Sequence, residues 1–211
     1  ILAKNNLVGN YNLDPNLNFV GLAADGGFAK YCVLDGDLVH VIPDSLSYEQ
    51  AALTEPAAVA VYAVRQSALK AGDTAAVFGL GPIGLLIVEA LRAAGASKIF
   101  AVELSPERQA KAEELGAIVV RPEEGETAVE AIHRLTNGGV DVSYEVTGVP
   151  VVLGQALAAV HKAGECMVVS IWEREANINP NEFAIQEKTL KGIIAYRHIF
   201  PKVLELMEQG Y

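Results

Sequence analysis

The sequence predicts an α/β protein with a doubly wound parallel sheet, and three observations carry that prediction. From Thr74 onward, short apolar runs alternate with amphipathic stretches of helical length. The short runs are nearly continuous and rich in β-branched residues, which is typical of strands covered by helices on both faces. A glycine-rich hexapeptide, Gly79 to Gly84, joins the first of these strands to the helix that follows.

Apolar runs place the expected strands, and apolar positions three and four residues apart place the expected helices. Strands are expected near 74–78, 97–102, 118–120, 140–146, 165–171 and 190–195. Helices are expected near 82–94, 106–115, 128–135, 151–161 and 200–209. This regular alternation predicts one sheet built by successive crossovers.

The region before Thr74 has a different character. Residues 1–27 are rich in Asn, Asp and Gly and predict a loop. The apolar runs 28–34 and 38–42 are bounded by turn residues, so we expect two paired antiparallel strands and a β-rich segment. After Ser47, a good N-cap, an alanine-rich helical stretch continues to about 69 and is interrupted at Pro56. We place a domain boundary and hinge at this interruption, between 1–55 and 56–211.

The composition excludes several classes of protein. With 51% hydrophobic and 20% charged residues, the chain is neither disordered nor fibrous. A net charge of -10 repels phosphates and anionic lipids, so we expect no nucleic acid and no membrane as partner. The longest apolar stretches are about half the ~18 residues of a membrane-spanning helix. Cys32 and Cys166 lack the spacing of a disulfide framework or zinc cluster, which favours a cytoplasmic location.

The hexapeptide matches the G-x-G-x-x-G pattern of dinucleotide-binding (Rossmann) domains in its expected setting, between a strand and a helix. Gly79 would allow the tight turn, Gly81 the close approach of a pyrophosphate, and Gly84 the packing of helix on strand. Pro82 suits the first helical turn, and with Ile83 it belongs to the helix N-terminus that would face the phosphates. The alternative is that the hexapeptide is an ordinary turn between a strand and a helix and has no role in binding.

Glu103 ends the next expected strand, 24 residues after Gly79. In dinucleotide-binding domains a carboxylate at this place accepts hydrogen bonds from the adenosine ribose, and it would repel a 2′-phosphate. The sequence therefore favours NAD over NADP as the cofactor. Arg108, one helical turn further on, keeps NADP open.

Five segments of the chain together carry a family resemblance: 25–31, 51–56, 79–84, 113–117 and 187–192. They resemble the zinc-dependent medium-chain alcohol dehydrogenases, in particular the 2,3-butanediol and sorbitol dehydrogenase branch. The resemblance implies a Rossmann domain inserted into a zinc-bearing catalytic domain, and hydride transfer between a secondary alcohol or diol and NAD. It also implies a small alcohol or ketone substrate and a homo-oligomer, with 192–196 as a candidate edge.

The resemblance also suggests site residues. Glu55 stands where this branch has a glutamate that reaches the catalytic zinc. The alternative is that Glu55 only caps the N-terminus of the helix that begins at Pro56, where a negative charge is favourable. Thr147 with Gly148, and Ser170 with Ile171, match positions that line the nicotinamide side, and ordinary strand ends are the alternative.

The departures from the family pattern predict a fragment. The family's zinc-binding cysteine and histidine-glutamate pair have no counterpart here, and a catalytic zinc needs about three protein ligands. We therefore expect the chain to be the cofactor-binding half of the enzyme, preceded by the remnant of a catalytic domain, and inactive alone. Ala3, Asn6 and Asp14 stand where relatives carry structural-zinc cysteines, so we expect that zinc to be absent.

Two other functions stay open. A zinc-free quinone or enoyl reductase shares this fold, but such enzymes usually prefer NADPH and lack the glutamate at the position of Glu55. A non-catalytic dinucleotide-binding module is the other alternative.

Overall fold

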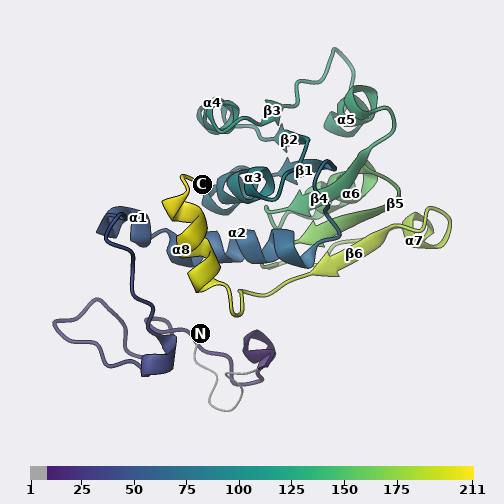
Figure 1. Cartoon of the computed structure of the whole chain (residues 1–211). Coiled ribbons are helices and arrows are strands. Elements are labelled where there is room, and N and C mark those ends of the chain that lie inside the picture. Colours follow the sequence, from purple (N-terminus) through teal and green to yellow (C-terminus); the bar gives the residue numbers. More distant parts are fainter. Residues whose placement is uncertain (1–8) are drawn as a thin grey trace.

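The computed structural model describes residues 9–211, and its centre is a six-stranded, entirely parallel sheet (Figure 1). The strands lie in the order β3-β2-β1-β4-β5-β6, so the chain builds outward from β1 to one edge and then from β4 to the other. Their bounds are β1 Thr74–Phe78, β2 Lys98–Val102, β3 Ile118–Val119, β4 Val140–Glu145, β5 Val160–Val168 and β6 Thr189–Gly192. The predicted doubly wound sheet is confirmed.

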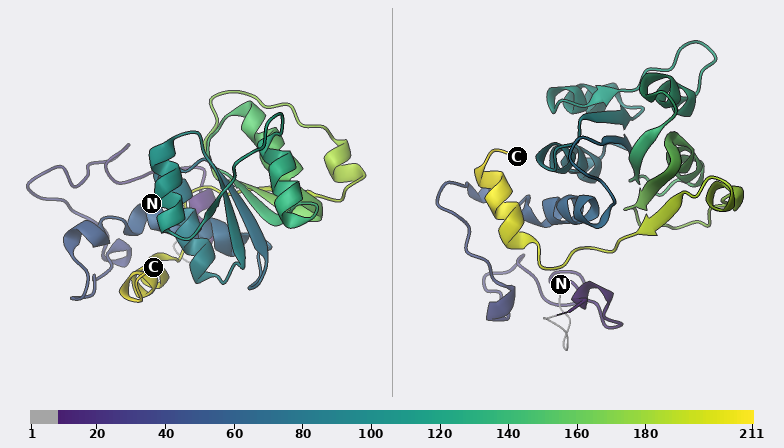
Figure 2. Two further views of the ribbon diagram at one scale, coloured as in Figure 1. Left: turned by 90° about the horizontal axis from the view of Figure 1, so that it is seen from above. Right: turned by 45° about the vertical axis from the view of Figure 1, so that its right-hand side comes forward.

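Helices cover both faces of the sheet, as the two turned views in Figure 2 show. In β1, Ala75 and Val77 pack with α2, α3 and α4, whereas Ala76 and Phe78 pack with α5 and α6 on the other face. The helices are α1 Tyr48–Ala51, α2 Thr54–Gln66, α3 Pro82–Ala93, α4 Pro106–Glu114, α5 Ala128–Thr136, α6 Pro150–Ala159, α7 Asn181–Ala184 and α8 Phe200–Glu208.

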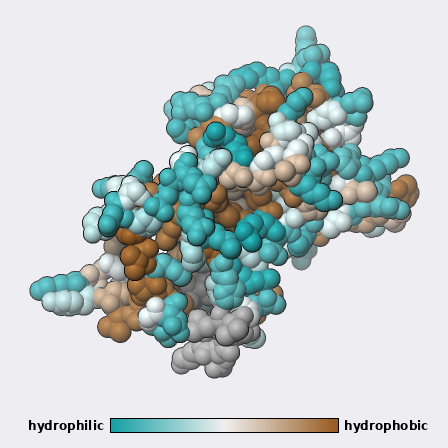
Figure 3. Space-filling model, in the orientation of Figure 1, coloured by the Kyte–Doolittle hydropathy of each residue, from teal (hydrophilic) through white to brown (hydrophobic). Residues whose placement is uncertain are grey.

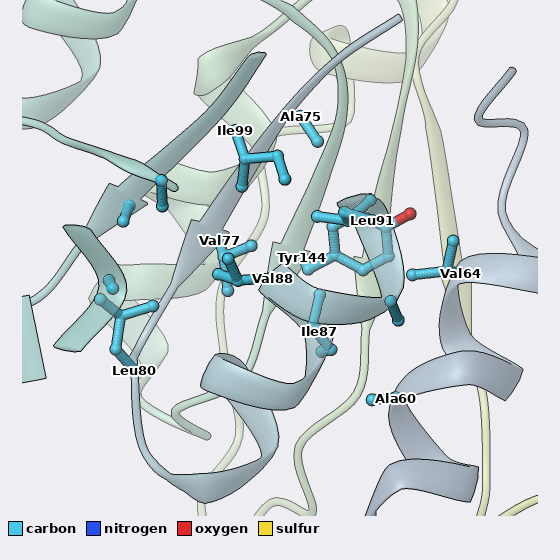
Figure 4. Close-up of a cluster of buried hydrophobic side chains, with 14 of the residues drawn as sticks. Ala60, Val64, Ala75, Val77, Leu80, Ile87, Val88, Leu91, Ile99 and Tyr144 are labelled. Carbon is cyan, nitrogen blue, oxygen red and sulfur yellow. The ribbon is translucent and has the colours of Figure 1, made fainter. Parts of the chain in front are cut away.

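The core on the α2 and α3 face centres on Tyr144 of β4 (Figure 4). Its ring is fully buried beside Ile87 and Leu91 of α3, and its hydroxyl reaches Ser67 Oγ at 2.8 Å. That hydrogen bond satisfies the one polar atom of the ring, as a buried tyrosine requires. Apolar burial from both layers therefore fixes β1 and β4 side by side.

Most predicted elements after Thr74 are present within a few residues of their expected bounds. The exception is β5, which begins at Val160, where we expected the preceding helix to continue through His161. The short helix α7 was not predicted. Within residues 9–211, no helix has the length and apolar character needed to cross a bilayer.

The prediction of a β-rich N-terminal part is wrong for the described residues. Neither 28–34 nor 38–42 forms a strand, and the only regular elements of residues 9–47 are the 3₁₀ turns η1 Tyr11–Leu13 and η2 Gly36–Leu38. A strand is stable only when its backbone groups pair with a neighbour, and no strand of the described residues pairs with these runs. Several of their apolar side chains are exposed, including Phe28 and Val41, and Figure 3 shows hydrophobic surface at the lower left of the molecule.

The expected helix after Ser47 is present but breaks earlier than predicted. Ser47 caps α1 through a reciprocal capping box with Gln50. The break falls at Ala52 and Leu53, and Pro56 lies inside the first turn of α2, where the missing N–H costs nothing. The domain boundary at 55 and 56 stays a prediction, and Ala3 and Asn6 lie outside the described residues.

Candidate dinucleotide site

The sheet changes its direction of growth between β1 and β4, and this switch point locates the candidate site. From β1 the chain crosses to β2, whereas from β4 it crosses to β5 on the opposite side. The crossovers on the two sides diverge, which leaves room for a ligand beyond the carboxyl ends of these strands. The predicted site residues around Gly79, Glu103, Thr147 and Ser170 all follow the carboxyl ends of β1, β2, β4 and β5.

Two glycines of the turn after β1 are required by their surroundings, and the third borders open space. Gly79 has a φ of +95°, and a Cβ there would lie 2.5 Å from Thr147 Cγ2. Gly84 is buried in α3, where a Cβ would overlap the carbonyl oxygen of Gly79. A Cβ at Gly81 would have no neighbour within 4 Å, so this residue borders open space. These surroundings fit a dinucleotide, because they bring backbone N–H groups to an open surface at a helix N-terminus.

Pro82 and Ile83 begin α3 in the way the sequence predicts. Gly81 is the N-cap in an extended conformation, and Pro82 occupies the first helical position, where its fixed φ suits the helix. The side chain of Ile83 is partly buried against the core on the α3 face. Ile83 thus anchors the start of the helix.

Glu103 lies directly against the glycine turn. One carboxylate oxygen accepts a hydrogen bond from the N–H of Leu80 at 2.8 Å, and the other accepts from Leu104 at 2.8 Å and Ser105 at 3.0 Å. Burial raises the pKa of Glu103, but these three N–H groups together with Arg108 outweigh it and hold the pKa below its ordinary value. The carboxylate is therefore ionised at neutral pH and fixed beside the turn.

Arg108 belongs to the same cluster. Its Nη1 lies 3.6 Å from Glu103 Oε2, and its side chain is more than half exposed. The guanidinium is thus turned toward the carboxylate and free to move into solvent.

A buried carboxylate that sequence reasoning missed joins the turns after β4 and β5. Glu145, the last residue of β4, is fully buried. Its Oε1 accepts from the N–H and hydroxyl of Thr147, at 2.7 and 2.5 Å, and from the N–H of Gly148 at 3.0 Å. Its Oε2 accepts from the Ser170 hydroxyl. The available signal was an acidic residue at the end of an otherwise apolar strand.

The other residues predicted on this side lie close together, and their contact with a nicotinamide stays a prediction. Thr147 and Ser170 share the Glu145 carboxylate, and Ile171 is exposed at the surface beyond Ser170. The structure thus brings the turns after β4 and β5 to one place, next to the glycine turn.

Glu55 stands apart from these residues, in the first turn of α2. Its carboxylate lies near Tyr196, where burial and this negative charge raise the pKa of the phenol. Tyr196 lines a cavity of about 450 Å³ together with His40 and His198. Across residues 9–211, no group of three His, Cys, Asp or Glu side chains is placed to hold a metal ion. The described residues therefore do not form a zinc site, and Glu55 as a ligand stays a prediction.

Comparison with known proteins agrees with this geometry. Residues 82–209, more than half of the chain, match the family model described as zinc-binding dehydrogenase. The chain belongs to the zinc-binding dehydrogenase family. Its sheet and flanking helices are the cofactor-binding domain of that family, as the resemblance implied.

Individual members of this family are similar over the whole chain. The (R,R)-butanediol dehydrogenase of Bacillus subtilis is 60% identical over 100% of the chain, and the chain covers 61% of that protein. The sorbitol dehydrogenase of the same organism is 38% identical over 96% of the chain, which covers 58% of it. The chain thus spans about three fifths of the length of these relatives.

Solved structures give the same result. The crystal structure of 2R,3R-butanediol dehydrogenase from Bacillus subtilis matches 100% of the chain with a TM-score of 0.95, at 60% identity and 61% coverage of that structure. A structure described as a zinc-binding dehydrogenase from Sinorhizobium meliloti 1021 bound to NADP matches 95% of the chain with a TM-score of 0.89, at 30% identity and 60% coverage.

Proposed function

We propose that this chain is the cofactor-binding part of a dehydrogenase that transfers a hydride between a secondary alcohol or diol and NAD. The observation that carries the proposal is the contact between Glu103 and the glycine turn, at the carboxyl edge of a doubly wound sheet. In this proposal the turn would bind the phosphates and the adjacent carboxylate would bind the ribose, and their contact supports both roles. Similarity to the butanediol and sorbitol dehydrogenases supports a diol or polyol substrate.

The residues of the chain divide the binding of the cofactor between them. The open backbone at Gly81 and the N-terminus of α3 would hold the pyrophosphate, and Glu103 would accept hydrogen bonds from the adenosine ribose. The turns at Thr147, Ser170 and Ile171 would border the nicotinamide. Bound NAD supplies the hydride acceptor, and the protein supplies orientation.

The choice between NAD and NADP provides the first test. We expect the chain to bind NADH at least about tenfold more tightly than NADPH, a difference of ~1.4 kcal/mol, because the Glu103 carboxylate repels a 2′-phosphate. In Glu103→Gln the ratio of the affinities for NADH and NADPH should decrease, since the repelling charge is removed while the side-chain shape is kept. Titration of both nucleotides by fluorescence measures the two affinities.

A matched control is Glu107→Gln, in the first turn of α4. Glu107 is exposed and carries the same charge, but it lies outside the contact between Glu103 and Leu80. Its removal should leave the preference for NADH unchanged. Tighter binding of NADPH by the wild-type chain would contradict NAD as the cofactor and favour a quinone or enoyl reductase.

We further propose that the 211 residues bind NAD(H) but do not turn over a diol by themselves. The described residues supply no group of three metal ligands, and hydride transfer in the proposed reaction requires zinc in the intact protein. Oxidation of 2,3-butanediol by this chain with added zinc would contradict the proposal. Binding of NADH without turnover would support it.

The association and location of the protein are also proposals. The strand β6 lies at the edge of the sheet and offers unpaired backbone groups to a second copy, which supports a homo-oligomer. Both Cys32 and Cys166 are free thiols, which supports a reducing cytoplasmic location.

A further inference from the structure

Glu145 carries a charge in a place where charges are rare. Its side chain is fully buried at the end of β4, and buried carboxylates are normally paired with a cation. Throughout residues 9–211, no Lys, Arg or His side chain forms an ion pair with it. Two backbone N–H groups and two hydroxyl groups hold the carboxylate instead.

Three groups donate hydrogen bonds to Oε1 of Glu145. A backbone N–H is only a donor, and both Thr147 and Gly148 direct theirs at Oε1. The Thr147 hydroxyl accepts from the N–H of Val149 at 3.1 Å, so its own proton points to Glu145. Oε1 therefore accepts three hydrogen bonds, an arrangement that suits a carboxylate oxygen.

The carboxylate also fixes the two turns that it joins. Gly148 has a φ of +70°, and a Cβ there would lie 2.9 Å from the carbonyl oxygen of Ile171, so the turns after β4 and β5 are in close contact. The Cγ2 of Thr147 lies close to Gly79 of the glycine turn. Glu145 thus holds two turns directly, and Thr147 carries the contact on to the glycine turn, without an ion pair to a Lys, Arg or His in residues 9–211.

These turns face the second half of a bound dinucleotide. The first half of the sheet, from β1 to β3, carries Glu103 and so would take the adenosine. A dinucleotide crosses the switch point, so its nicotinamide would lie beyond β4 and β5, on the side of Glu145. This step rests on the proposed function. The nicotinamide ring is positively charged in NAD+ and neutral in NADH, so a nearby buried charge acts on the two forms differently.

We propose that Glu145 is a positioning residue whose buried negative charge favours NAD+ over NADH in the cofactor site. The hydrogen bonds of the carboxylate hold the turns that border the nicotinamide. Its charge attracts the oxidised ring and has no comparable effect on the reduced ring. A binding site that stabilises NAD+ relative to NADH favours the release of NADH after the alcohol has been oxidised.

The deciding experiment compares the affinities of Glu145→Gln for NAD+, measured by calorimetry, and for NADH, measured by fluorescence. Glutamine keeps the shape and can still accept from Thr147 and Gly148. We expect the affinity for NAD+ to fall relative to NADH by at least about fivefold, as Coulomb attraction within roughly 15 Å at an effective dielectric constant of about 20 implies. A purely structural role would weaken both nucleotides equally, and that result would overturn the proposal.

Glu165→Gln is the matched control. Glu165 is a second buried glutamate of the sheet, in β5, but it lies toward the amino ends of the strands and accepts from the N–H of Ala68 at 2.6 Å. Its substitution should lower the melting temperature and leave the ratio of the two affinities unchanged. If Glu165→Gln changed the ratio of the affinities for NAD+ and NADH as much as Glu145→Gln does, the proposed role of the Glu145 charge would be overturned.

A second variant, Ile171→Lys, tests the same electrostatic effect on the two nucleotides without disturbing the core. Ile171 is 83% exposed, and its carbonyl packs against the turn that Glu145 holds. Ile171→Lys adds a positive charge at the surface of the turns that Glu145 holds, so it should shift the ratio of the two affinities in the same direction as Glu145→Gln, whereas Ile171→Gln should not. If Glu145→Gln does not fold, an unchanged ratio in Ile171→Lys overturns the proposal. A wild-type chain that binds neither nucleotide overturns the proposed function as well.

Discussion

At the scale of single residues, two glycines of the turn after β1 have different roles, one in folding and one in binding. Gly84 is enclosed by the turn itself, and its missing side chain lets α3 approach the backbone of Gly79. Gly81 instead borders open space. The same residue type therefore serves stability at one position and ligand access at the other.

Substituting alanine at these two positions should separate the two roles. Gly84→Ala should lose at least about 1 kcal/mol of unfolding free energy, because a methyl group would overlap a backbone oxygen that cannot move aside. The better helix propensity of alanine, worth roughly 1 kcal/mol, offsets only part of that cost. Gly81→Ala should unfold like the wild type but bind NADH at least about tenfold more weakly, since its methyl group occupies the space for the pyrophosphate. Urea titrations and NADH binding check both, and equal stability of the two variants would contradict this account.

At the scale of elements, a polar cluster ties β4 to β5 and β1 at the amino edge of the sheet. Asp141 Oδ2 accepts from the N–H and hydroxyl of Thr74, at 2.8 and 2.7 Å, and Asp141 Oδ1 lies 3.1 Å from His161 Nε2. Burial lowers the pKa of His161, but the Lys162 carbonyl and the Asp141 carboxylate outweigh it, so the pKa is raised. For Asp141, burial raises the pKa, but the bonds from Thr74 and the charge of His161 lower it overall.

This cluster predicts a specific pH dependence of stability. Because the pKa of His161 is higher in the folded state, its contribution is fully present below the ordinary value of 6.5 and is lost as the pH rises through the folded value. Both side chains are more than one third exposed, so the contribution is about 0.2–1 kcal/mol. The unfolding free energy of the wild type should therefore decrease from about pH 6 to pH 9 relative to His161→Gln. Parallel urea titrations measure this, and identical pH profiles of the two proteins would contradict it.

At the scale of the whole molecule, the two edges of the sheet differ. The edge strand β3 is two residues long, whereas β6 is longer and continues the sheet at the other side. Because Ile193 donates its N–H to Val168 of β5, the N–H of Gly192 points away from the sheet. The edge at β6 is therefore the surface that a second copy would extend.

The proposed homo-oligomer gives a test at this edge. The wild-type chain should sediment as a dimer or larger species, and Gly192→Pro should shift it toward the monomer while the fold is kept. Proline removes an outward N–H and is tolerated on edge strands. Gly192→Ala keeps that N–H and is the control. A wild-type chain that is monomeric at every concentration would contradict the proposal.

The sequence predicted the elements of the sheet and the turn at Gly79 because both depend on local patterns. Apolar periodicity and helix-start signals act within about one element, so they identified β1, α3 and Glu103 without knowledge of their neighbours. The strands expected before Ser47 were wrong, because an apolar run bounded by turn residues forms a strand only where a partner strand pairs with it. Glu145 was missed because one of its hydrogen-bond donors, Ser170, lies 25 residues away along the chain.

By itself, the sequence determined the doubly wound sheet, the dinucleotide fingerprint with its acidic partner, and the resemblance to the zinc-dependent dehydrogenases. Only the tertiary structure decided which side chains meet at the carboxyl edge. It placed Glu103 against the glycine turn, buried Glu145 between the turns of two neighbouring strands, and left Glu55 apart from any group of three metal ligands in residues 9–211. The physical reason is that local propensity fixes the elements, whereas the contacts between turns depend on which strands become neighbours in the sheet.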